Sequence, residues 1–283
     1  MKWSWIIPLL LLALASCADA PVQKERLEIR IMTLNIGDPP KGKMEPLELA
    51  EIVEKADQPD FICLQEGYPQ KAWQERIRNT LGYMHSFSGM DTETDVKDST
   101  RTQLLLSRHP LQQVEARSFP SKVMHGSGLM ALAHINNETI GVVCTHLDTI
   151  PKRRTADGTV IYGLWETIGT IWTEMFQETS RTRNVRDLFA WLDERPQPNM
   201  LIAGDFNTIF LSKAIRLMKE RFVDALLFDR DYFTGTYQRI HAPIQPRVDF
   251  IFHSMGITTL DAEVLENPYG DHRAVVAHIA LEN

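Results

Sequence analysis

Residues 200–207 read Met-Leu-Ile-Ala-Gly-Asp-Phe-Asn, an apolar run that ends in two polar residues. The run from Met200 to Ala203 is short, apolar and followed by a glycine, which predicts a buried β-strand. Asp205 and Asn207 are two residues apart, so an extended backbone directs both side chains to the same side. One acidic residue after a strand is usually only a turn former. This stretch therefore indicates a functional site only if other strands of the chain end in the same way.

Four more places in the chain set a polar residue beside an apolar strand. They are Asn35 after 29–34, Glu66 after 61–65, His146 after 142–145, and Asp271 with His272 before 274–281. Strand ends in sheet-based folds converge at one edge of the sheet, where ligands bind. We therefore expect these side chains to form one site together with Asp205 and Asn207.

Several carboxylates gathered at one edge repel one another unless a cation or shared protons neutralise them. Oxygen ligands suit a hard ion such as Mg²⁺, Mn²⁺ or Ca²⁺, and the candidates are Asn35, Glu66, Asp205 and Asp271. The chain has no HxH, CxxC or HExxH spacing, which disfavours a zinc site. The sequence thus predicts a magnesium or manganese site.

From residue 27 onward, short apolar runs alternate with amphipathic stretches, and no repeat or Pro/Gly linker divides them. This predicts a single α/β domain over residues 27–283. Strands are predicted at 27–34, 61–65, 103–107, 128–134, 139–145, 200–203, 247–252 and 274–281. Helices are predicted at 47–56, 70–80, 164–192 and 212–220, the last with Ser212 as its N-cap. Residues 91–102 are polar and aperiodic, which predicts a loop.

Six short motifs, in chain order, carry a family resemblance. They are MTLNI at 32–36, LQE at 64–66, THLD at 145–148, GDFN at 204–207, VDFI at 248–251 and GDHRAV at 270–275. In this order they resemble the endonuclease/exonuclease/phosphatase superfamily, over nearly the whole chain after residue 27. The resemblance implies a four-layer sandwich of two packed β-sheets flanked by helices, with the site at one edge of the sandwich.

The resemblance also implies roles for the residues around the metal. Glu66 would be the principal metal ligand, supported by Asn35 and Asp271. Asp205 would position or activate the attacking water, and Asn207 would orient the water and the phosphate. Such an arrangement supplies what a phosphoryl centre needs, namely charge neutralisation and an in-line nucleophile.

By the same resemblance, His272 would act as general base or contact a phosphate oxygen, with Asp249 holding its imidazole. Asp249 enters the site only through this resemblance. His146 would bind the phosphate or protonate the leaving group. Two positions depart from the family pattern: Gly270 stands where serine is commoner, and Gln103 stands where asparagine is common, so Gln103 is left out of the site.

The first sixteen residues have the features of an export signal. Lys2 precedes an apolar run at 6–14, and Leu-Ala-Ser then leads to Cys17. The order resembles a bacterial lipobox, which predicts a lipoprotein signal peptide over 1–16, lipidation of Cys17 and a tether over 17–26. An ordinary cleavable signal is the alternative. The predicted location is the bacterial cell envelope, with the exported domain anchored to a membrane by its N-terminal lipid.

The formal net charge is −7, which argues against a protein that coats nucleic acid through bulk charge. Cys63 and Cys144 both lie in apolar runs that are predicted strands. Exported proteins can form disulfides, but isolated cysteines in core strands are more often buried apolar residues. We therefore expect both to be free thiols.

Between His146 and the next predicted strand lies an unusual segment. It contains Lys152-Arg153-Arg154 and then a helical face formed by Trp165, Ile168, Trp172, Met175 and Phe176. This face is expected to pack on the sheet; the alternative is an aromatic element that contacts a membrane or grips substrate.

The predicted activity is Mg²⁺- or Mn²⁺-dependent hydrolysis of a phosphoester, most directly a phosphodiester, by a monomer. Candidate substrates are nucleic acid, a phospholipid head group or a small phosphodiester. The alternatives are a sphingomyelinase-like or inositol-phosphatase-like hydrolase and an inactive binding domain on the same scaffold. The inactive domain is disfavoured because every position of the site holds a competent residue.

Overall fold

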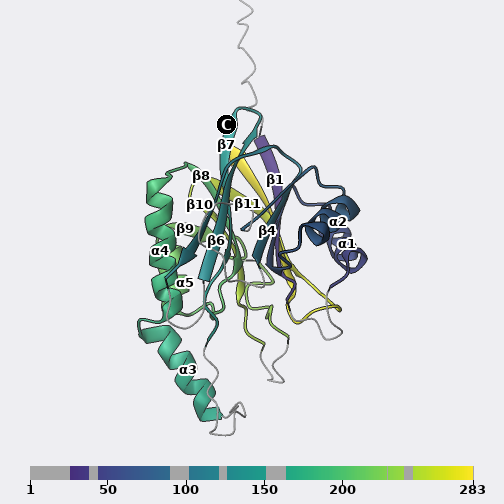
Figure 1. Ribbon diagram of the computed structural model, residues 1–283. Helices are drawn as coiled ribbons and strands as arrows, with labels where there is room; N and C mark the ends of the chain where they lie inside the picture. Colours follow the sequence, from purple (N-terminus) through teal and green to yellow (C-terminus); the bar gives the residue numbers. More distant parts are fainter. Residues whose placement is uncertain are drawn as a thin grey trace, which may run out of the picture.

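Two six-stranded sheets lie at the centre of the computed structural model (Figure 1), which describes residues 26–37, 44–89, 102–120, 126–150, 164–227, 229–238 and 245–282. Sheet A has the strand order β11 (Ile257–Leu265), β12 (Ala274–Glu282), β1 (Arg26–Asn35), β2 (Phe61–Gly67), β4 (Thr102–Ser107) and β3 (His85–Ser88). Only the central pair β1 and β2 is parallel, and each of the other neighbouring pairs is antiparallel.

Sheet B has the strand order β5 (Leu111–Phe119), β6 (Gly126–Ile135), β7 (Glu138–His146), β8 (Asn199–Asp205), β10 (Asp249–Ser254) and β9 (Phe222–Asp224). Here too the central pair, β7 and β8, is parallel and the remaining pairs are antiparallel. The two sheets therefore repeat one pattern of strand directions.

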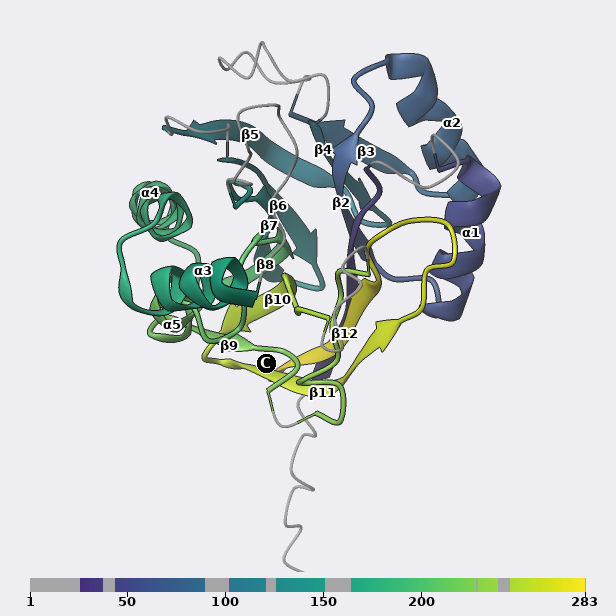
Figure 2. The same cartoon turned by 90° about the horizontal axis from the view of Figure 1, so that it is seen from below.

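Helices cover the outer face of each sheet (Figure 2). On sheet A lie α1 (Pro46–Lys55) and α2 (Lys71–Leu81), whose apolar side chains share a core with strands β1, β2 and β4. On sheet B lie α4 (Ser180–Glu194) and α5 (Lys213–Lys219), which share a second core with β7, β8 and β10. The third and largest core fills the space between the sheets. The predicted four-layer sandwich is confirmed.

A disulfide crosses the central core, and it corrects the expectation of free thiols. Cys63 of β2 is bonded to Cys144 of β7, so the bridge joins the two sheets through their central strands. Both side chains are buried and point between the sheets. The sequence placed each cysteine in a core strand, but only the packing of the sheets brings the two strands face to face.

All eight predicted strands are present, and the predicted helix starts have the expected chemistry. Pro46 is the first residue of α1, where its missing N–H costs nothing. The Ser212 side chain caps α5 by accepting a hydrogen bond from the Ile215 N–H, at 3.2 Å. The sequence did not predict β3, β5, β9 and β11, which are the outermost strands of the two sheets.

The predicted helix over 164–192 is wrong in one respect, because it is two helices. The first is α3 (Leu164–Phe176), and α4 begins at Ser180 after Thr179, whose side chain accepts a hydrogen bond from the Thr182 N–H. Glu174 forms a buried ion pair with Arg181. This ion pair lies across the break and links α3 to α4.

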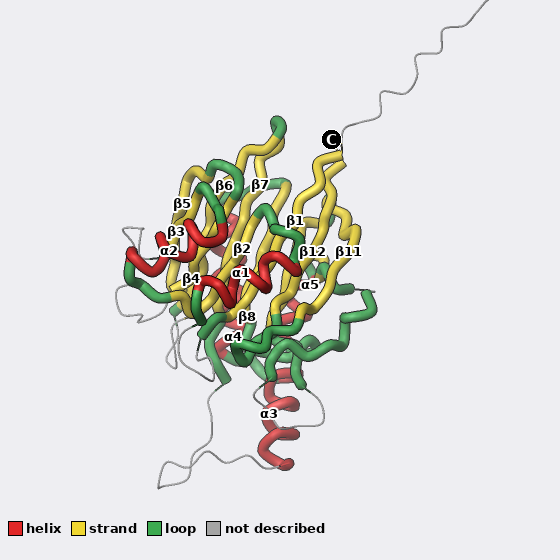
Figure 3. Tube along the Cα trace, turned by 90° about the vertical axis from the view of Figure 1, so that its right-hand side faces the viewer, coloured by secondary structure: helices red, strands yellow, loops and turns green. Residues whose placement is uncertain are grey.

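The expectation that the aromatic face of α3 packs on the sheet is also wrong. Trp172 and Phe176 are exposed, together with Ile168. Figures 1 and 3 show α3 extending beyond the strand ends, away from the layers formed by the other helices. Figure 1 places this extension at the edge of the sandwich opposite the label C, where β12 ends.

Some expectations fall outside the described residues. These are the signal and Cys17, residues 91–101 of the predicted loop, the basic triplet at 152–154 and the side chain of Trp165. Among the helices that the structure describes, none is long and apolar enough to cross a membrane.

Candidate active site

The candidate site lies where the two central parallel pairs end. In sheet A, Asn35 at the end of β1 is paired in register with Gln65 of β2, and Glu66 follows. In sheet B, His146 at the end of β7 is paired with Asp205 at the end of β8. Because the strands of a parallel pair end at the same edge, each sheet presents two functional residues there. Packing of the sheets brings the two sets together.

The Asn35 side chain connects the two sheets. Its Nδ2 donates to Glu66 Oε1 at 3.3 Å and to Asp205 Oδ2 at 3.0 Å. Its Oδ1 accepts a hydrogen bond from the Gly37 N–H at 2.9 Å, which fixes the orientation of the amide. One buried amide therefore holds a carboxylate from each sheet.

The backbone is strained at two residues of the site. Glu66 has a φ of 57° and Asn207 a φ of 49°, values that residues with a β-carbon seldom adopt. Gly37 lies so close to Glu66 that a β-carbon there would fall 2.0 Å from Oε2. Backbone strain of this kind clusters at functional sites, and here it sets the direction of the Glu66 carboxylate.

The two-residue spacing predicts that an extended backbone directs the side chains of Asp205 and Asn207 to the same side. In the structure the strand ends at Asp205, so the prediction does not extend to Asn207. The Asn207 N–H donates to Asp205 Oδ1 at 2.8 Å, and the Asn207 side chain donates to the Leu147 carbonyl at 3.0 Å. Residue 207 is no longer in a strand, so its positive φ and these two hydrogen bonds determine where its side chain lies.

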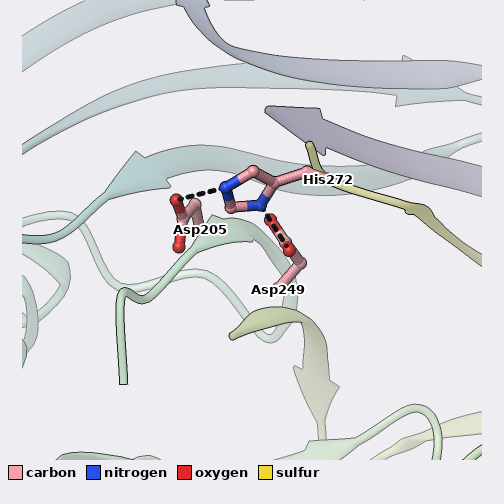
Figure 4. Close-up of side chains that lie close together, drawn as sticks. All are labelled: Asp205, Asp249 and His272. Carbon is pink, nitrogen blue, oxygen red and sulfur yellow. Dashed lines mark hydrogen bonds and ion pairs between the residues drawn. The ribbon is translucent and has the colours of Figure 1, made fainter. Parts of the chain in front are cut away.

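His272 lies between two aspartates of sheet B, as Figure 4 shows. Its Nδ1 is 2.9 Å from Asp249 Oδ2, and its Nε2 is 3.9 Å from Asp205 Oδ2. All three side chains are buried. The Asn267 side chain donates to the His272 carbonyl at 2.7 Å, and the ring of Tyr237 lies 5.0 Å from the imidazole. The imidazole is thus fixed on several sides.

The electrostatics raise the pKa of two of these groups, Asp205 and His272. Burial, reinforced by the nearby charge of Asp249, raises the pKa of Asp205. For His272, burial alone would lower the pKa, but Asp249 and Asp205 outweigh it and raise the pKa to about 10. The cause common to both shifts is the negative charge of Asp249, which raises the pKa of each neighbouring group.

His146 faces the carboxylates from the other side. Its Nε2 lies 3.6 Å from Asp205 Oδ2 and 3.9 Å from Glu66 Oε1. This nitrogen is buried and has no hydrogen-bond partner among the described residues. A buried nitrogen without a partner, beside two carboxylates of different sheets, fits a site whose polar groups are completed by a cation or a ligand.

Buried groups of the right chemistry for a cation therefore exist. Three buried side chains lie close enough together to bind one metal ion. Each of Asp205, Asp249 and His272 offers one ligand atom, and these atoms lie within 4.8 Å of one another. Glu66 and Asn35 lie on the other side of Asp205. Asp271 is buried beside His272, and its carbonyl accepts a hydrogen bond from the Gln238 N–H at 2.8 Å. Its role as a metal ligand stays a prediction.

The model of the endonuclease/exonuclease/phosphatase family matches residues 32–272, which is most of the chain. The chain belongs to this family. The family consists typically of metal-dependent phosphoesterases, and the match spans every residue predicted for the site, from Asn35 to His272.

Solved structures agree with this family fold. Family members from Bacteroides thetaiotaomicron and Bacteroides vulgatus have TM-scores of 0.69 and 0.67 at 14% and 17% identity, covering 92% and 90% of this chain and 100% of each of theirs. TDP2 from D. rerio, complexed with a single strand DNA product, has a TM-score of 0.64 at 16% identity, covering 89% of this chain and 98% of its own. Among curated protein sequences, none matches.

The sequence did not predict the residues whose hydrogen bonds hold the loops next to the site. Glu174 accepts a hydrogen bond from the Thr208 hydroxyl at 2.8 Å, and Arg181 donates to the Thr149 carbonyl at 2.9 Å. The Asn184 side chain accepts from the Asp148 N–H at 3.0 Å. These contacts hold the chain just after His146 and just after Asn207. No spacing in the sequence reveals them, because the partners come from distant segments.

Proposed function

We propose that this chain hydrolyses phosphodiesters by attack of a water molecule, with the assistance of Mg²⁺ or Mn²⁺. The observation that carries the proposal is the environment of Asp205 Oδ2. It accepts a hydrogen bond from Asn35 and lies within 4 Å of both His146 and His272. A phosphate bound here would meet two imidazoles and the carboxylates of Asp205 and Glu66, whose charge a divalent ion would neutralise.

Glu66, with Asn35 and Asp271, would hold the ion, which would neutralise charge on the phosphate oxygens when bound. Oxygen ligands of this kind fit Mg²⁺ or Mn²⁺. The amide of Asn35 has a further task, because it keeps the Glu66 and Asp205 carboxylates at fixed positions. Without it, the two would repel each other.

Asp205 is placed to accept a proton from the attacking water. The rise in its pKa makes this carboxylate a stronger base than an exposed aspartate. The Asn207 N–H donates to its Oδ1 and the Asn35 amide donates to its Oδ2, which is also the oxygen nearest to both imidazoles. In this scheme Asn207 also fixes the loop that faces the phosphate.

His272 would contact a phosphate oxygen as a protonated imidazole. With its pKa raised to about 10, it carries a positive charge at neutral pH. Asp249 keeps that charge in place by accepting from Nδ1 and leaves Nε2 to face the substrate. His146, from the opposite side, would stabilise the phosphate or donate a proton to the leaving group.

We further propose that the protein is exported and anchored by lipid at Cys17. The apolar segment at 6–14 and the Leu-Ala-Ser-Cys sequence support this. The disulfide between Cys63 and Cys144 supports it independently, since structural disulfides persist in oxidising compartments. Cys17→Ala should abolish incorporation of radiolabelled palmitate in cells and release the protein into the soluble fraction; labelling that persists in the variant would contradict the anchor.

The test of the activity is a substrate panel assayed with Mg²⁺, Mn²⁺ or EDTA. The panel contains bis-p-nitrophenyl phosphate, single-stranded DNA, RNA, sphingomyelin and phosphoinositides. DNA is included because a protein of this fold was solved with a single strand DNA product. Glu66→Ala and His272→Ala should be inactive, whereas His134→Ala, which alters an exposed histidine away from the site, should be fully active. Turnover in EDTA, or wild-type rates in the first two variants, would refute the mechanism.

A further inference from the structure

Helix α3 presents an apolar face to solvent. Four side chains form it, and they are Ile168, Ile171, Trp172 and Phe176, exposed by 45%, 39%, 60% and 53%. We call these four residues the α3 face. Their spacing places them on one side of the helix, and the rings of Trp172 and Phe176 lie 4.4 Å apart. Of the ten large hydrophobic side chains exposed among the described residues, these four share one helix. Single exposed apolar residues are ordinary, but a cluster calls for a partner.

The other side of α3 is held firmly on the protein. Glu174 is buried, pairs with Arg181 and accepts a hydrogen bond from Thr208. At the end of the helix, Arg216 of α5 donates to the carbonyls of Met175 and Leu211. The helix is therefore fixed in orientation at its C-terminal end, and the exposure of the α3 face does not come from a frayed segment.

The α3 face lies at the edge of the sandwich that carries the candidate site. In Figures 1 and 3, α3 extends past the edge opposite the end of β12, and that is the edge at which β7 and β8 end with His146 and Asp205. Arg181 also links the base of α3 to Thr149, three residues after His146. Whatever the α3 face contacts therefore lies beside the catalytic edge.

The size and charge of the α3 face indicate the kind of partner. Its exposed apolar area is on the order of 400 Å², about half of what one subunit contributes to a standard protein interface. The helix sequence contains Glu166 and Glu174 but no Lys or Arg, which disfavours phosphate backbones and anionic lipids. The net charge of −7 acts in the same direction. Tryptophan and phenylalanine are the side chains that favour the boundary between lipid and water.

We propose that the α3 face binds to the surface of an electrically neutral lipid layer and places the catalytic edge next to phosphodiester head groups there. The binding to lipid is independent of catalysis, whereas the action on head groups rests on the proposed function. The predicted anchor at Cys17 is compatible with it. Eight residues separate Cys17 from Arg26 at the start of β1, and this stretch can span at most about 30 Å, close to the length of the ten-residue strand β1. A molecule lying along the membrane can therefore use both contacts.

The experiment measures binding to vesicles in EDTA, so that no lipid is hydrolysed. The protein is the chain from residue 17 onward with Cys17→Ser, which removes the acyl chains. Phosphatidylcholine vesicles are sedimented with this protein, with Trp172→Ser/Phe176→Ser, and with a matched control, Met84→Ser/Met255→Ser, which removes two exposed apolar side chains elsewhere. We expect the partition coefficient to fall roughly tenfold or more in the α3 variant and to stay within about twofold in the control. Binding should not depend on salt.

The outcomes separate the possibilities. Hydrolysis of bis-p-nitrophenyl phosphate in Mn²⁺ should be equal in all three proteins, which also shows that each is folded; the single variant Trp172→Gln serves if the double variant is not. Equal vesicle binding by wild type and α3 variant, or no binding by either, would overturn the proposal. A concentration-dependent dimer that the wild type and the control form but the α3 variant does not would also overturn the proposal, because the α3 face would then bind a second copy of the chain. If no protein hydrolyses any diester yet vesicle binding depends on the α3 face, the proposed function fails and the docking surface stands.

Discussion

Sheets A and B have the same order of strand directions, yet they contribute different chemistry to one edge. In each sheet the central parallel pair ends in two residues of the candidate site. In sheet A these are Asn35 and Glu66, an amide and a carboxylate suited to a cation. In sheet B they are His146 and Asp205, groups suited to proton transfer and to contact with a phosphate. One scaffold pattern therefore places oxygen and amide groups that suit a metal in one sheet and groups that suit acid–base chemistry in the other.

The connections between the parallel strands differ as much as the strand ends do. In sheet A, β1 is joined to β2 through α1, which packs on the sheet with Leu49, Ile52 and Val53 buried. In sheet B, β7 is joined to β8 through a longer segment that contains α3 and α4. Only α4 covers the sheet. Helix α3 therefore extends the edge of the sandwich and contributes none of its described side chains to the core beneath α4.

The largest expected effect is on catalysis when the matching carboxylates are changed. Glu66→Gln in sheet A and Asp205→Asn in sheet B should each lower kcat by roughly 10³-fold. Because both act in one site, the double variant should be little worse than either single variant. Asp193→Asn, at an exposed position in α4, is the control. Steady-state kinetics on bis-p-nitrophenyl phosphate measures kcat for each variant. If the loss of kcat in the double variant equals the product of the two single losses, the carboxylates of the two sheets act separately.

The next effect concerns the covalent link between the sheets. Cys63→Ser/Cys144→Ser should lower the free energy of unfolding by about 4 kcal/mol, because the bridge closes a loop with a sequence separation of 81 residues. Denaturant unfolding of the oxidised wild type and the variant measures this, and reduction of the wild type should reproduce the variant. If dithiothreitol leaves the wild-type midpoint unchanged, the bridge does not form in solution.

A slightly smaller effect is expected in the long connection of sheet B. Arg181→Met leaves the buried Glu174 without its ion-pair partner and should cost about 3 kcal/mol of unfolding free energy. Adding Glu174→Met should restore part of that loss, because no buried charge then remains. Thermal and denaturant unfolding of both singles and the double provide the cycle. Strictly additive losses would show that the two side chains do not interact.

The last effect is a pH dependence of stability located in sheet B. The folded-state pKa of His272 is raised to about 10, against about 6.5 in the unfolded chain. The stabilisation it provides is complete below pH 6.5 and is lost as the pH rises towards 10. In EDTA, the stability advantage of wild type over His272→Gln should therefore shrink between pH 6.5 and 10. Unfolding curves at several pH values measure it, and parallel curves for the two proteins would contradict it.

Strand position explains what the sequence revealed of the fold. The eight predicted strands include the four central ones, which are apolar because both faces are covered. The four that escaped prediction form the outer edges of the sheets, where one flank meets solvent and polar residues interrupt the pattern. The sequence of β5, Leu-Gln-Gln-Val-Glu-Ala-Arg-Ser-Phe, is an example. The short β9 has only three residues and leaves no periodic signal.

The candidate site was more predictable than its supports. Asn35, Glu66, His146 and Asp205 follow apolar strands directly, so local sequence is enough to select them. Asp249 needed the family resemblance, since it begins a strand and has no distinctive neighbour. The disulfide and the exposure of α3 depend on how sheets and helices pack, and no local pattern contains that information. The break at Thr179 was missed because apolar residues continue at helical spacing on both sides of it.

The central claim is that a divalent ion is held where the carboxylates of the two sheets meet, and diffraction tests it most directly. Crystals grown or soaked with Mn²⁺ should give an anomalous peak within coordination distance of a Glu66 carboxylate oxygen, near Asp205 and His146. Crystals of Glu66→Gln should lose the peak. An anomalous peak only elsewhere on the molecule would contradict this claim. So would full hydrolysis of bis-p-nitrophenyl phosphate by protein whose crystals show no peak.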